Sequence, residues 1–204
     1  MNEKLTRTIA SVGLFIGGIF GMVGSFVSSA PLRGLAWGVD GVGLILASAL
    51  LTIYFFRKGY DTLAAGFLIF IVGEALILSC NAIDLNENVS SFGTGTSLWA
   101  ASLALISFQN VFPKIVRLTG FIAAVLFSIV SVQIFTGHHV TALMEPLPFY
   151  AYPFLAATIF GWGWMLLRTN YLQHRIEIKN RLEKIATDQE STTDRAERTL
   201  QPVR

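Results

Sequence analysis

One acidic residue lies deep inside an apolar run of this sequence, and it is the first candidate for chemistry. Glu74 stands within residues 63–80, which read LAAGFLIFIVGEALILSC. A carboxyl group in hydrocarbon costs about 3 kcal/mol on insertion scales, so a partner, a water-filled cavity or a proton must offset that cost. Two readings stay open: Glu74 is a protonation site that serves function, or it is a hydrogen-bonded residue that holds helices together.

Two further polar residues are candidates for a solute path. Asp40 lies between Gly38 and Gly41 near the start of another apolar run, and Asn81 follows Glu74 by about two helical turns, on the same helix face. Asp40 also fits a simpler role, as an interfacial residue near a helix N-terminus, where negative charge is favoured. We expect Glu74, Asp40 and Asn81 to share one half of the membrane domain.

Catalytic and metal-binding patterns are absent from the sequence. His138 and His139 are adjacent in a predicted loop, and no H-x-x-x-H spacing accompanies them. The single cysteine, Cys80, excludes an internal disulfide and a cysteine-based metal cluster. No serine motif, nucleotide loop or pair of catalytic carboxylates appears. We therefore expect no metal, no cofactor and no enzymatic activity.

The composition indicates a membrane protein. Of 204 residues, 53% are hydrophobic and 14% are charged, whereas soluble domains carry about a quarter charged residues. The mean hydropathy is +0.58, and several runs approach the ~20 residues that a helix needs to cross a bilayer. The net charge of +2 is too small to indicate a nucleic-acid partner.

The apolar runs predict an all-α integral membrane protein, a bundle of six transmembrane helices within residues 1–168. The predicted helices are 9–29, 35–56, 61–81, 93–112, 115–136 and 147–168. Gly13, Gly66 and Gly120 recur at near-equal intervals, so an arrangement as three repeated helical hairpins stays open. Residues 169–204 form a polar cytoplasmic tail, which we expect to be partly helical and then disordered.

The distribution of basic residues predicts the orientation. Lys and Arg collect on the cytoplasmic side of membrane proteins. Here they flank alternate ends of the predicted helices: Lys4, Arg7, Arg57, Lys58, Lys114, Arg117, Arg168 and Arg175. The opposite turns hold Arg33 with the acidic residues Asp84, Glu87 and Glu145. We therefore expect a multi-pass protein of the cell inner (plasma) membrane with both termini in the cytoplasm.

Two helices carry features of packing or movement. Gly13, Gly17, Gly21 and Gly24 form a small-residue strip on the first helix. Such a strip is typical of close helix packing, and lining a solute path is the alternative. Pro148 and Pro153 stand in the first third of the last predicted helix. They are candidates for a gating kink, with a static kink as the alternative.

The layout resembles that of the acetate/succinate uptake transporters. The shared features are six spans, a chain of about this length, and an inner turn, Arg57-Lys58-Gly59, followed by a helix. The N-P-A-P-L-G-L type of signature of that family is missing near the first helix, where Ser11-Val12-Gly13-Leu14-Phe15 stands instead. No site residue is carried over from the resemblance.

The sequence favours a small transporter or channel for a small solute, with proton linkage through Glu74 as an open possibility. The alternative is a non-catalytic membrane subunit or scaffold that binds a partner through the glycine strip and the cytoplasmic tail. The lipid bilayer is the expected environment, a homo-oligomer stays open, and the identity of the solute is not indicated.

Overall fold

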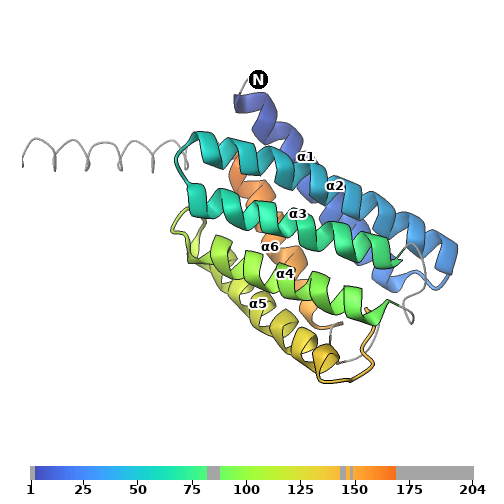
Figure 1. Ribbon diagram of the computed structural model, residues 1–204. Helices are drawn as coiled ribbons and strands as arrows, with labels where there is room; N and C mark the ends of the chain where they lie inside the picture. The colour runs from blue at the N-terminus through green and yellow to red at the C-terminus, as the bar shows by residue number, and fades with distance from the viewer. Residues whose placement is uncertain (1–2, 82–87, 143–145, 148, 169–204) are drawn as a thin grey trace, which may run out of the picture. The chain divides into compact units, whose positions relative to one another are not determined.

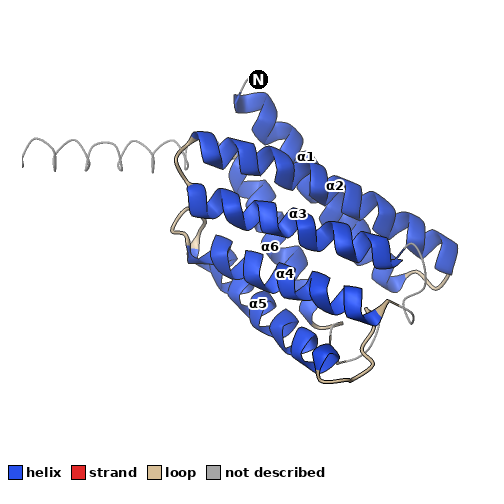
Figure 2. Ribbon diagram, in the orientation of Figure 1, coloured by secondary structure: helices blue, strands red, loops and turns tan. Residues whose placement is uncertain are grey.

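The computed structural model describes residues 3–81, 88–142, 146–147 and 149–168 of the chain. These residues form α-helices and turns, with no strand among them (Figures 1 and 2). The helices are α1 (Glu3–Phe26), α2 (Ala30–Arg57), α3 (Asp61–Asn81), α4 (Val89–Phe108), α5 (Lys114–Phe135) and α6 (Ala151–Leu167). Contacts divide the chain into two units, Met1–Leu167 and Arg168–Arg204. All six helices belong to the first unit, and the predicted tail, 169–204, lies outside the described residues.

Five of these helices are long and apolar enough to cross a membrane, and the chain is therefore a multi-pass membrane protein. The sixth, α6, is apolar but has only 17 residues. Large apolar side chains are exposed along the outer faces of the helices, among them Val12, Leu46, Val72, Val125 and Val132. Such a surface suits lipid tails rather than water.

The helices form a closed ring in which each packs against its two neighbours along the chain, and α1 closes the ring against α6. No other pair of the described helices comes into backbone contact. Figure 1 shows α2, α3 and α4 side by side with α6 crossing behind them. A ring of this kind leaves a central space, and the side chains that project into it decide whether that space is filled or hollow.

Several helix bounds differ from those predicted, because an apolar run marks only the part of a helix that lies in hydrocarbon. The first helix begins at Glu3 rather than at residue 9 and ends at Phe26 rather than at 29. Its polar first turns are anchored by an ion pair between Glu3 and Lys58, with 2.7 Å between Oε1 and Nζ. The second helix begins at Ala30 rather than at 35, with Pro31 in its first turn, where proline is well tolerated.

The fourth helix is displaced toward the N-terminus, to Val89–Phe108 from the predicted 93–112. The hydroxyl groups in its small polar start are satisfied within the helix: Thr94 Oγ1 donates to Ser90 O, one turn earlier, at 3.0 Å. The helix ends at Phe108, and the Arg117 side chain donates hydrogen bonds to carbonyl oxygens of its last turn. Its Nε donates to Ser107 O at 2.6 Å and its Nη2 to Phe108 O at 3.3 Å.

Five aromatic side chains fill one end of the ring. We call them the aromatic cluster: Phe55, Phe67, Phe70, Phe112 and Trp162. Every one is buried, and neighbouring ring centroids lie between 5.1 Å (Phe67–Trp162) and 6.2 Å (Phe55–Phe112) apart. Distances in this range are typical of packed aromatic pairs. The end of the ring where α2 finishes and α3 begins is therefore closed by aromatic side chains.

Candidate functional site

The opposite half of the ring, where α1 ends and α2 begins, contains a cavity. It is lined by Gly17, Gly18, Gly21, Met22, Trp37, Asp40, Leu44, Ile77, Trp99, Tyr152, Leu155, Ala156 and Ile159. The space open to the centres of water-sized molecules is about 40 Å³, and one water needs roughly 10–15 Å³ by that measure. The cavity therefore has room for a few waters or for a small solute.

The glycine strip of α1 makes this space by letting α2 come close. A Cβ atom at Gly13 would lie 2.8 Å from Gly43 O, and one at Gly24 would lie 2.5 Å from Trp37 Cδ1. Between them, a Cβ at Gly21 would lie 2.8 Å from Asp40 Oδ2. The strip thus faces α2, while Gly17 and Gly21 also border the cavity. Packing and lining, weighed as alternatives from the sequence, occur in the same strip.

Glu74 lies in α3 with its side chain buried, at 2% exposure. The residue before it, Gly73, faces Gly95 of α4, and a Cβ at either glycine would lie 3.1–3.2 Å from the carbonyl oxygen of the other. This close approach places Trp99, one turn after Gly95, against α3. The Trp99 indole lies near the Glu74 carboxyl, but Glu74 Oε2 and Trp99 Nε1 make no hydrogen bond of good geometry.

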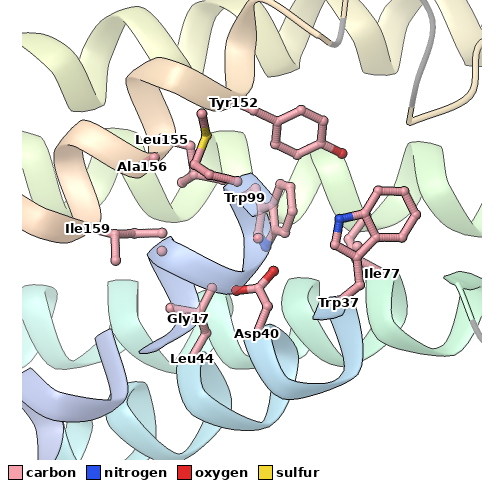
Figure 3. Close-up of a pocket in the computed structure, with 13 residues that line it drawn as sticks. Gly17, Trp37, Asp40, Leu44, Ile77, Trp99, Tyr152, Leu155, Ala156 and Ile159 are labelled. Carbon is pink, nitrogen blue, oxygen red and sulfur yellow. The ribbon is translucent and has the colours of Figure 1, made fainter. Parts of the chain in front are cut away.

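Asp40 and Glu74 are brought together in the folded chain. The Asp40 carboxyl lines the cavity and is close enough to the Glu74 carboxyl for the two to interact electrostatically. The Tyr152 side chain of α6 is also close enough to interact electrostatically with both carboxyl groups. In Figure 3, Asp40, Trp37, Trp99 and Tyr152 point into one space from α2, α4 and α6.

The lining residues include no Lys, Arg or His. The cation with a described contact at the cavity wall is Arg33, whose Cζ lies 5.7 Å from the centre of the Trp37 ring. Arg33 also donates from Nη1 to Val27 O at 3.5 Å. The Asp40 carboxyl thus faces a cavity lined by aromatic rings and by no basic side chain, and the buried Glu74 carboxyl lies near it outside the lining.

Three site residues were missed from the sequence: Trp37, Trp99 and Tyr152. Trp37 precedes Asp40 by about one helical turn, so the same-face rule could have found it. Tyr152 is one of several aromatic residues near the start of the last predicted helix, and nothing local in the sequence separates an interfacial role from a cavity role. Trp99 is stacked on Phe70 with 6.2 Å between centroids, a contact that only the ring arrangement of helices reveals.

Other candidates from the sequence lie apart from this site or outside the described residues. Asn81 is the last residue of α3, and its side chain is not described. Pro148 is not described either. Pro153 is the third residue of α6, where first-turn N–H groups have no helical acceptor, so it removes no hydrogen bond and imposes no kink there.

The histidines and the cysteine form no metal site in the described part of the chain, where no three His, Cys, Asp or Glu residues are placed to hold an ion. His138 is exposed and its Nδ1 lies 3.2 Å from Thr136 Oγ1. His139 is also exposed. Cys80 is buried and unpaired with any other cysteine.

The comparisons with known proteins do not place this chain in a family. No protein-family model, no curated protein and no solved structure matches it.

Proposed function

We propose that this chain is a transporter or channel for a small solute, linked to protons through Asp40 and Glu74. The observation that carries the proposal is the cavity inside the helix ring, with one carboxyl group in its wall and a second beside it. Ionisable groups inside a membrane domain are costly and usually mark a solute or proton pathway.

Proton linkage follows from the surroundings of the two carboxyl groups. Neighbouring carboxylates repel each other, and no basic side chain in the cavity lining offsets that repulsion. The number of protons held by the pair therefore depends on what else occupies the cavity. A solute that changes the charge or the hydration of the cavity also changes the proton count, and this is the basis of coupled transport.

The orientation and the number of spans belong to the same proposal. The basic turns, with Arg57 and Lys58 or with Lys114 and Arg117, lie at the end of the ring that holds the aromatic cluster, so that end faces the cytoplasm. Both termini are then cytoplasmic and the cavity lies in the outer half. At 17 residues, α6 is about 25 Å long at roughly 1.5 Å per residue, and its packing between α1 and α5 favours a sixth, short span.

The alternative, a non-catalytic subunit that binds a partner protein, has weaker support. Its main surface was the glycine strip of α1, and that strip packs against α2 of the same chain. The cytoplasmic tail lies outside the described residues and adds no observation. A cavity with carboxyl groups has no evident use in such a subunit.

Flux into proteoliposomes under an imposed pH gradient tests the proposal. The panel holds small cations, monocarboxylates, amides, polyols and inorganic ions, each offered to wild type and to Glu74→Gln. We expect flux of one class, which the pH gradient drives in wild type but not in the variant. The control is Asp61→Asn, an exposed acidic residue in the first turn of the same helix. If the pH gradient drives flux in Glu74→Gln as it does in wild type, proton linkage through Glu74 would be disproved.

A further inference from the structure

We infer that the solute which binds in this cavity is a small organic cation; the inference rests on the transport function proposed above and names its substrate class. The observation behind it is a small cavity whose lining combines aromatic faces with the Asp40 carboxyl and no basic side chain, with the buried Glu74 carboxyl near it.

The aromatic residues provide faces that attract positive charge. Trp37, Trp99 and Tyr152 all line the cavity, and the π faces of Trp and Tyr bind ammonium and guanidinium groups, more strongly where water is excluded. The Arg33 guanidinium over Trp37, at 5.7 Å, is one such contact within the chain itself. An anion would meet the negative faces of the same rings.

The Asp40 carboxyl provides an acceptor in the cavity wall, where a donor on the solute can reach it. Near it, Glu74 Oε2 is buried without a hydrogen-bond partner. An anionic solute would add negative charge beside these two acidic groups. A neutral solute would bring no charge to offset that of an ionised carboxylate.

Few ionisable groups surround Asp40 and Glu74. Asp40 of α2 and Tyr152 of α6 line the cavity, and Glu74 of α3 lies near both without lining it. The lining residues from α1 and α4 are glycines, Met22 and Trp99, none of them ionisable. Arg33 lies over the Trp37 ring, with 5.7 Å between its Cζ and the ring centroid. No basic side chain in the lining would compete with a cation for the carboxyl groups.

Binding of a cation is then balanced by release of a proton to the solvent. One protonated carboxyl group gives up its O–H proton to water, and the carboxylate that forms pairs with the incoming cation. The net charge inside the cavity is unchanged, so one proton leaves for each monovalent cation that enters. The space open to the centres of water-sized molecules, about 40 Å³, favours a small cation over a large one.

Guanidinium and urea form a matched pair of probes for this inference, because they have nearly the same shape and differ in charge. We would titrate each into purified full-length protein in detergent and record heat and proton release at constant ionic strength. We expect saturable binding of guanidinium with release of about one proton per site, and binding of urea at least tenfold weaker. Tetramethylammonium, which has no hydrogen-bond donor, serves as a second cation.

Variants separate the site from general effects of the salt. Asp40→Asn should weaken guanidinium binding at least tenfold and abolish proton release, whereas Asp40→Glu should retain part of both. Asp61→Asn should bind like wild type. Thermal unfolding of each variant in detergent establishes that it is folded. Equal binding of urea and guanidinium, or undiminished guanidinium binding by folded Asp40→Asn, would overturn the inference.

Failure of the inference and failure of the proposed function give different results. Guanidinium binding with no flux of guanidinium in proteoliposomes would support the cation site and overturn transport. Flux of acetate or urea that depends on Glu74, with no guanidinium binding, would support transport and overturn the cation site. Flux of guanidinium against protons, with the variant pattern above, would support both.

Discussion

The two ends of the helix ring use residues of very different size. At the cavity end, bare backbone at Gly17 and Gly21 stands opposite Asp40, and a single added methyl group at Gly21 would press on its carboxyl oxygen. At the other end, the five rings of the aromatic cluster fill the centre with contacts of 5.1–6.2 Å between centroids. Phe70 marks the boundary, since it touches Trp162 on one side and Trp99 on the other.

The difference shows how a ring of helices controls its own centre. Helices that contact only their neighbours leave a space between them, and side-chain size decides whether that space is solid or hollow. Small residues leave a cavity with the Asp40 carboxyl in its wall at one end, and large aromatic residues close the other end. In the transport cycle proposed here, the aromatic cluster is the part that must open.

The largest effect is expected at the aromatic end, from Trp162→Ala. The side chain is 1% exposed and touches three members of the cluster. Its removal leaves a large void, which costs about 3–5 kcal/mol in protein cores. We expect a marked loss of thermal stability in detergent. The matched control is Trp164→Ala, because Trp164 is 54% exposed on the same helix; an equal loss in both variants would contradict a packed aromatic end.

The sequence predicted where the helices lie in the chain better than it predicted which helix faces pack together. The third helix, 61–81, was found with its bounds, because a long apolar run is framed by Gly59, which has a φ of +72°, and by polar residues after Asn81. Hydropathy indicates whether a helix lies in lipid, but it does not indicate which of its faces packs against another helix. Trp162 and Trp164 are two residues apart and equally apolar, yet Trp162 is buried and Trp164 is exposed.

The candidate site could be predicted only in part for the same reason. Glu74 and Asp40 stand out because charge is rare in apolar runs, and that signal needs no structure. Their proximity, and the presence of Trp99 and Tyr152 beside them, depend on the ring closing through α1 and α6. Apolar and aromatic residues are common everywhere in a membrane domain, so their position in a sequence carries little information about a site.

The next effect concerns the close approach at the cavity end. Gly21→Ala places a methyl group against Asp40, and overpacking of this kind costs about 1–3 kcal/mol. We expect lower thermal stability together with weaker binding of the transported solute, because the carboxyl group must turn away. Gly38→Ala is the control, since a Cβ there would meet nothing within 4 Å. If Gly21→Ala matched that control in both respects, the strip would not position Asp40.

A smaller effect is expected from the hydroxyl group of Tyr152. Tyr152→Phe keeps the ring and removes one polar group, and a single hydrogen bond contributes about 0.5–1.5 kcal/mol. We expect solute affinity to fall several-fold while the unfolding temperature stays unchanged. Tyr150→Phe provides the comparison, as Tyr150 is 54% exposed. Equal affinities for the two variants and wild type would remove the hydroxyl from the site.

A small effect on stability is also expected from Glu74→Leu. The two roles left open by the sequence differ here: a residue that holds helices together should cost stability when it is lost. Because Glu74 Oε2 has no hydrogen-bond partner, we expect the change in unfolding free energy to stay within about 1 kcal/mol of wild type. Flux should nevertheless be lost. A strongly destabilised Glu74→Leu would favour the structural role instead.

Reaction with a thiol reagent tests most directly whether one end of the ring is hollow and the other closed. In a Cys80→Ala background, Ala156→Cys places a thiol in the cavity wall and Ala64→Cys places one in the buried first turn of α3. A positively charged methanethiosulfonate is added in detergent, where it reaches both ends of the protein. We predict fast labelling at position 156, slowed by guanidinium, and no labelling at position 64. Labelling at 64 as fast as at 156, or no labelling at 156, would contradict the account.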